Sequence, residues 1–137
     1  SFDTNINYVG IDIVEDLMSK NKLKFKSNLN VNFYCKDLTE YNDFDNFDFI
    51  LMRDFFIHLP IPLIKKILIN LKDSNCRYFA FNNYEKLNIN EEISTGQHRK
   101  INLLKEPFNL GIPFYKIQEI NNEHNPDQDN FIYIYKN

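Results

Sequence analysis

Three aspartates lie at or just beyond the end of a short apolar run. The runs are Tyr8–Ile13, Val31–Cys35 and Phe47–Met52, and the acids are Asp12, Asp37 and Asp54. Short apolar runs of this kind predict buried strands. Ligands bind an open α/β sheet at the carboxyl ends of its strands, so we expect the three carboxylates at one such edge. Each acid alone would equally suit a helix cap or a loop, whereas the three together favour a site.

The first two acids suit a nucleoside. The carboxylate of Asp12 can accept hydrogen bonds from both hydroxyls of a ribose, and that of Asp37, 25 residues later, from the amino group of an adenine. Gly10 and Ile13 flank Asp12, and Leu38 would lie against the adenine ring. These residues predict a cofactor site with a nucleoside part.

The elements around these acids alternate between strand and helix. Val14, Leu17 and Met18 predict a helix after the first strand, with acids in its first turn. Pro60 and Pro62 mark the first turn of a second helix. Its apolar face comprises Leu63, Ile64, Ile67, Leu68 and Leu71. The remaining predicted strands are Arg77–Asn82, Phe114–Ile120 and Phe131–Tyr135, the last two as an antiparallel hairpin. The pattern predicts an α/β three-layer sandwich with a mostly parallel sheet.

Residues 85–113 carry no clean period, which indicates a functional lid or a partly ordered segment. Arg99 in this segment would pair with an anionic substrate or with Glu91 or Glu92. We attribute the abundance of asparagine, including Asn82–Asn83, to the base composition of the genome.

Composition excludes several classes. The net charge of −3 argues against a dedicated nucleic-acid module, and the basic residues between 20 and 26 suit a solvated helix end. Only 3 glycines are present, and none forms a P-loop or a G-x-G-x-x-G loop. Cys35 and Cys76 lack metal or redox spacing and predict buried free thiols in a reducing, cytoplasmic compartment. No apolar run is long enough to predict a membrane span.

Several stretches resemble the class I S-adenosylmethionine-dependent methyltransferases. Tyr8–Ile13 is similar to their second strand, Lys36-Asp37-Leu38 to their third-strand motif, and Phe47–Leu59 to their fourth strand with the helix after it. Ser94–Leu103 and Pro107–Pro113 resemble a subgroup of small, mostly uncharacterised members. Together the resemblance covers residues 7–136.

This resemblance implies roles for individual residues. Asp12 would bind the ribose of S-adenosyl-L-methionine and Asp37 would lie at its adenine. Arg53 and Asp54 would lie beside the methionine part or the methyl acceptor. The acceptor pocket would be shaped by residues 95–109, which include Thr95, Arg99 and Asn102.

His58 follows Asp54 by four residues, a spacing that shares one face of a helix. Three interpretations stay open for His58. It would be a general base for the acceptor, one of a pair of metal ligands with Asp54, or a histidine in a capping or core contact with that carboxylate. Asp54 and His58 are therefore the catalytic candidates.

The chain departs from the family at its start, because the family opens with a strand and a glycine-rich loop. Only seven residues precede Tyr8, and none of them is glycine. We therefore expect a single domain over residues 1–137 that lacks its N-terminal βα unit, with exposed strand edges that favour self-association. The expected function is methyl transfer to a small-molecule or protein acceptor. The alternative is a degenerate, non-catalytic binding or scaffold domain.

Overall fold

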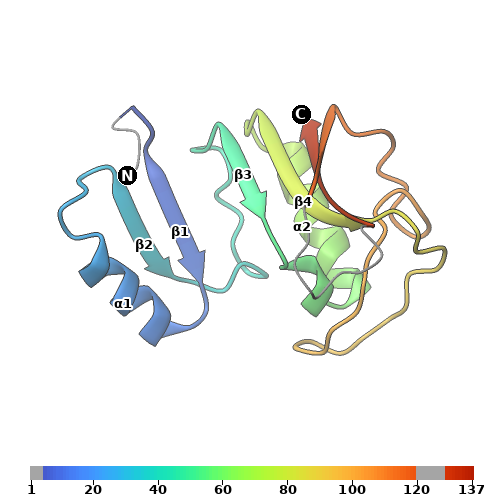
Figure 1. The fold of residues 1–137 in the computed structure, drawn as a ribbon, viewed down its shortest axis with the longest axis horizontal. Helices are drawn as coiled ribbons and strands as arrows, with labels where there is room; N and C mark the ends of the chain where they lie inside the picture. Colours follow the sequence, from blue (N-terminus) through green and yellow to red (C-terminus); the bar gives the residue numbers. More distant parts are fainter. Residues whose placement is uncertain (1–4, 120–128) are drawn as a thin grey trace. The chain divides into compact units, whose positions relative to one another are not determined.

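The computed structural model describes residues 5–119 and 129–137 and divides into two compact units, Ser1–Asn42 and Asp43–Asn137. Each unit contains parallel strands connected through a helix (Figure 1). We describe the two units separately.

The first unit is a β-α-β motif of β1 (Tyr8–Asp12), α1 (Glu15–Lys24) and β2 (Val31–Cys35). The two strands pair in parallel, with Asp12 opposite Cys35. Met18 of α1 packs with Val31 and Phe33 in the core of this unit. Val14 and Leu17 are 51% and 43% exposed, so only Met18 of the predicted apolar stripe is buried.

The second unit contains β3 (Phe49–Met52), the 3₁₀ helix η1 (Phe56–His58), α2 (Ile61–Asp73), β4 (Tyr78–Tyr84), β5 (Tyr115–Gln118) and β6 (Asn130–Lys136). The strand order is β3-β4-β6-β5. β3 and β4 are parallel, whereas β6 is antiparallel to both of its neighbours. The predicted antiparallel pairing of the last two strands is therefore confirmed.

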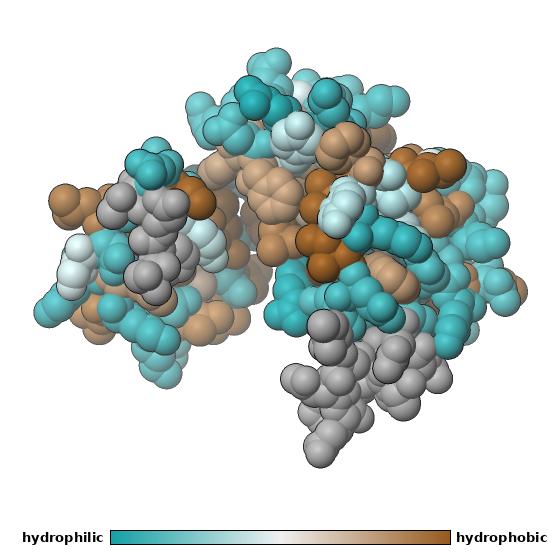
Figure 2. Space-filling view, turned by 45° about the horizontal axis from the view of Figure 1, so that its top comes forward, coloured by the Kyte–Doolittle hydropathy of each residue, from teal (hydrophilic) through white to brown (hydrophobic). Residues whose placement is uncertain are grey.

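Packing in the second unit follows the predicted apolar patterns. α2 has a proline in its first turn and buries Ile64, Ile67 and Leu71, which confirms most of its predicted apolar face. The ring of Phe56 stacks on that of Phe81, with 4.6 Å between the centroids. Hydrophobic residues are also interspersed with hydrophilic ones at the surface (Figure 2).

The mixed α/β class is confirmed. The described residues do not form the clear three-layer sandwich that was predicted. Their strands divide into a two-stranded and a four-stranded sheet, because each strand finds its hydrogen-bonding partner within its own unit. Neither α1 nor α2, the two α-helices in the described part of the chain, is long and apolar enough to cross a membrane. Both cysteines are free, yet only Cys76 is buried; the prediction of burial is wrong for Cys35, which is exposed.

Candidate functional site

Asp12 and Asp37 lie at the same edge of the β1–β2 sheet. Asp12 is the last residue of β1, and its carbonyl oxygen accepts a hydrogen bond from the Lys36 amide at 3.0 Å. Asp37 is the next residue after Lys36. The parallel register therefore brings the carboxyl ends of both strands, and with them both acids, to one edge.

Both carboxylates are oriented by the backbone that follows them. Oδ1 of Asp12 accepts the Val14 amide at 2.9 Å, and Oδ1 of Asp37 accepts the amide and hydroxyl of Thr39 at 2.8 and 2.7 Å. Among the described residues, neither carboxylate forms an ion pair. Each carboxylate can therefore still accept hydrogen bonds from a ligand, which is what a ribose and an adenine amino group supply.

Gly10 has a packing reason to be glycine. A Cβ at this position would lie 2.6 and 2.7 Å from two ring carbons of Phe33, its partner across the β1–β2 pair. The ring of Phe33 also contacts Tyr8, with 5.9 Å between centroids. The side chain of Ile13 is 65% exposed and Leu38 is half-buried, so the predicted cofactor-contacting residues surround Asp12 and Asp37 without forming a closed cavity.

A second polar cluster lies just beyond β3, in the second unit. Asp54 adopts a φ of 53°, in the left-handed region, and its amide donates to Oδ1 of Asn82 at 2.6 Å. The carboxylate of Glu119 accepts Nε of Arg53 at 2.8 Å and Nδ2 of Asn130 at 2.6 Å. The hydrogen bond and the charge of Glu119 raise the pKa of Arg53. Non-glycine residues with positive φ persist only where the surroundings hold them, and Asn82 does so here.

Tyr84 at the end of β4 belongs to this cluster. Burial, and then the carboxylates of Asp54, Glu119 and Asp129, raise the pKa of Tyr84. Nζ of Lys100 lies 5.3 Å from the centroid of the Tyr84 ring and 3.3 Å from the Asp129 carboxylate.

Five members of this cluster were not predicted from the sequence: Asn82, Tyr84, Glu119, Asp129 and Asn130. Base composition is a wrong explanation for Asn82 and Asn83, because these residues are 3% and 0% exposed and both side chains are hydrogen-bonded. The sequence signal that could have indicated this cluster is the pair Asn82–Asn83 inside an apolar strand, because buried polar side chains almost always have hydrogen-bond partners.

His58 does not use the helical spacing with Asp54. Asp54 precedes η1, and its left-handed backbone interrupts the helical periodicity on which that pairing depends. Nδ1 of His58 instead lies 3.1 Å from the carbonyl oxygen of Gln97. In the described part of the chain, no group of three or more histidine, cysteine or acidic residues could hold a metal ion.

Two of the expected acceptor-binding side chains are buried and fasten residues 85–113 to the rest of the second unit. Arg99 is 7% exposed and its guanidinium donates to the carbonyl oxygens of Phe56, Leu59 and Glu91 at 3.1, 2.9 and 2.7 Å. Burial lowers the pKa of Arg99. Its hydrogen-bond partners are thus backbone carbonyls, and of the two expected carboxylates, those of Glu91 and Glu92, only that of Glu92 acts on it, through its charge, which raises the pKa of Arg99 by less than burial lowers it.

Asn102 is 1% exposed and, like Arg99, helps to hold residues 85–113 through buried hydrogen bonds. Its Nδ2 donates to the Leu87 carbonyl at 2.8 Å, and its Oδ1 accepts the Leu104 amide at 3.1 Å. Asn83 of β4 adds a hydrogen bond from the Leu103 amide at 2.6 Å. The segment predicted to be a functional lid or a partly ordered segment is therefore held by buried hydrogen bonds. Thr95 is exposed in a turn within it.

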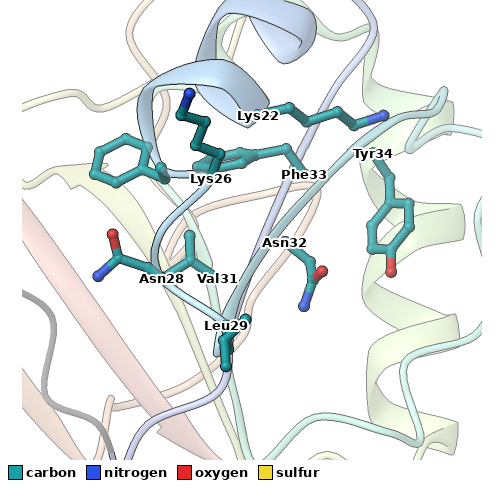
Figure 3. Close-up of a pocket in the computed structure, with 9 residues that line it drawn as sticks. Lys22, Lys26, Asn28, Leu29, Val31, Asn32, Phe33 and Tyr34 are labelled. Carbon is teal, nitrogen blue, oxygen red and sulfur yellow. The ribbon is translucent and has the colours of Figure 1, made fainter.

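A shallow pocket of about 350 Å³ lies along β2 and the turn after α1, and neither Asp12 nor Asp37 lines it (Figure 3). Its lining includes Lys22 in the last turn of α1, Lys26 in the turn after this helix, and the exposed Leu29. This pocket is thus not the site predicted from the strand-end acids.

Comparison with known proteins is informative at the level of the fold. No protein-family model matches the chain, and no curated protein matches it. Among solved structures, TehB from Haemophilus influenzae superimposes with a TM-score of 0.62 at 18% identity, over 93% of this chain and 49% of that chain. The present chain therefore spans about half the length of TehB. The chain therefore shares the fold of the matched half of TehB.

Proposed function

We propose that the chain takes part in methyl transfer from S-adenosyl-L-methionine to a small-molecule or protein acceptor in the cytoplasm. The observation that carries the proposal is the parallel β1–β2 pair, which ends in Asp12 and Asp37 at one edge. The fold shared with TehB supports it, since ligands bind open α/β sheets at the carboxyl edge of the strands.

The residues present fit the nucleoside half of this cofactor. Asp12 would accept the ribose hydroxyls, Asp37 the adenine amino group, and Ile13 and Leu38 would supply apolar contacts. When bound, the cofactor supplies an electrophilic methyl group on a sulfonium. No glycine-rich loop that would approach its methionine part occurs in the 137 residues, so of the two parts of the cofactor these residues account for the nucleoside.

Arg53 and Asp54 are the residues we assign to the acceptor side. Arg53 is anchored through Nε by Glu119, and its side chain remains 61% exposed. Asp54 has a 44% exposed side chain on a backbone fixed by Asn82. An exposed carboxylate held in this way can accept a proton from an acceptor nucleophile or orient it.

The test is isothermal titration calorimetry of the full chain with S-adenosylhomocysteine and with adenosine. Loss of the bonds from two ribose hydroxyls corresponds to about 1.5–3 kcal/mol, so Asp12→Ala should weaken binding by about 10- to 100-fold. Asp37→Ala should weaken adenosine binding as well. Asp16→Ala is the matched control, because it removes one acidic charge from the first turn of α1 in the same unit.

The two arms of this titration separate the proposal from its alternatives. Equal binding by the wild type and Asp12→Ala would contradict the cofactor assignment. Binding of S-adenosylhomocysteine without methyl transfer to any acceptor offered would favour the alternative of a non-catalytic binding or scaffold domain.

A further inference from the structure

We infer that His58 and His98 form a binding site for a divalent transition-metal ion such as Zn²⁺ or Ni²⁺. The two residues are 40 positions apart in the sequence, yet their ring centroids lie 5.6 Å apart with the ring planes inclined by 58°. Both histidines are exposed, so an ion can reach them. The inference goes beyond the proposed function, because it requires neither a cofactor nor a methyl acceptor.

The separation of the rings suits two ligands of one ion. With metal–nitrogen bonds of about 2.0–2.1 Å and an angle near tetrahedral, two imidazoles on one ion have centroids about 5 Å apart. The observed 5.6 Å exceeds this by only about half an ångström. Small rotations of two exposed side chains supply such a change.

The hydrogen bond of His58 prepares its other nitrogen for a metal. A carbonyl oxygen can only accept, so Nδ1 of His58, 3.1 Å from the Gln97 carbonyl, must carry the hydrogen. Nε2 then presents its lone pair. Metal-binding histidines typically donate their other N–H to a carbonyl or carboxylate in this way, which fixes the tautomer and the ring orientation. Among the described residues, the ring of His98 forms no hydrogen bond.

The two segments that carry the histidines are fastened to each other. The Gly96 amide donates to the carbonyl oxygen of His58 at 3.0 Å, and the Arg99 amide to that of Ile57 at 3.0 Å. The guanidinium of Arg99 adds its bonds to the carbonyls of Phe56 and Leu59. The backbone positions of the pair are thus set before an ion binds, which lowers the entropic cost of binding.

The ligand set determines which ions this site selects. Imidazole nitrogens suit Zn²⁺, Ni²⁺ and Cu²⁺, whereas Mg²⁺ and Ca²⁺ prefer oxygen ligands. With two protein ligands, water would fill the remaining coordination positions, which leaves them open to a further ligand. An ion held on Nε2 of His58 would occupy the nitrogen that a general base would use.

The experiment is calorimetric titration of the tag-free full chain with ZnCl₂ and with NiCl₂, and with MgCl₂ for comparison. We expect one Zn²⁺ or Ni²⁺ per chain and no Mg²⁺ binding. His58→Gln and His98→Gln should each weaken binding by at least about tenfold. Both residues are exposed, so these variants should fold, and circular dichroism checks that they do.

His124→Gln is the control, since it removes the remaining histidine of the chain. It should leave the affinity unchanged. Absence of 1:1 binding, retention of wild-type affinity in either His58→Gln or His98→Gln, or loss of binding in His124→Gln would overturn the inference.

Discussion

Replacing Arg99 by alanine separates a structural role from a role in acceptor binding. Its guanidinium reaches the carbonyl oxygens of Phe56, Leu59 and Glu91, and that of Ile57 at 3.5 Å. Truncation removes all of these bonds from a residue that is 7% exposed. We expect Arg99→Ala to lower the free energy of unfolding, whether or not a ligand is present.

The size of the loss follows from which carbonyls keep another donor. The Phe56 carbonyl still accepts the Leu59 amide, and the Ile57 carbonyl still accepts the Arg99 amide. The carbonyl of Leu59, a residue 5% exposed, is left without its donor, whereas that of the exposed Glu91 can be hydrated. One unsatisfied buried carbonyl costs about 1–3 kcal/mol, and the lost packing of the arginine stem adds about 1 kcal/mol. The total is about 2–4 kcal/mol.

Urea denaturation followed by circular dichroism measures this loss, since the chain has no tryptophan to report by fluorescence. A loss of this size also lowers Tm by about 8–16 °C for a chain of this length. Arg77→Ala is the matched control, because Arg77 is exposed and its side chain makes no hydrogen bond among the described residues. Free energies of unfolding that agree to within about 0.5 kcal/mol for Arg99→Ala and Arg77→Ala would refute the structural role.

Three further predictions concern stability. Gly10→Ala should lower the free energy of unfolding in urea denaturation by about 1–3 kcal/mol, because the added Cβ overlaps the Phe33 ring. Phe33→Leu in the same chain should recover part of this loss. If the losses of the two substitutions simply add, the clash is contradicted. Asp54→Gly should be more stable than Asp54→Ala by about 0.5–1 kcal/mol, because the φ of 53° at this position is strained for alanine and free for glycine. Equal stabilities of the two variants would contradict backbone strain. Burial alone would raise the pKa of Glu85, but the hydrogen bonds that its carboxylate accepts from Lys116 and Tyr133 outweigh burial, so the pKa is lowered. Because the pKa of Glu85 is lower in the folded state, this carboxylate contributes stability that is lost as the pH falls through that pKa. Below a pH of about 4 the wild type should therefore lose more stability than Glu85→Gln. Parallel pH profiles of the two proteins would be the contrary result.

Local patterns were sufficient to predict most of the secondary structure. The apolar run Val31–Cys35 coincides with β2, and the prolines before the apolar stripe locate the start of α2. These signals depend on neighbouring residues, which the sequence displays directly. The same holds for the acids, since Asp12 ends a strand and Asp37 follows one.

The features that the sequence did not predict depend on long-range contacts. Arg99 bonds to carbonyls 40–43 positions away, and Asn82 bonds to Asp54, 28 positions away. No periodicity reports such pairs. Gly10 illustrates the same point, because a cross-strand contact with Phe33 accounts for it, whereas its position beside Asp12 indicated a ligand. The division into two sheets also follows from strand pairing, which the order of elements alone did not determine.

The proposed function requires a nucleoside to bind at the edge that carries Asp12 and Asp37. The most direct measurement is a titration of the nitrogen-15-labelled chain with S-adenosylhomocysteine, followed by amide NMR shifts. We expect saturable shifts concentrated at residues 10–14 and 36–39. Shifts confined to residues 22–34, where the shallow pocket lies, or the absence of saturable shifts at the Asp12–Asp37 edge, would contradict it.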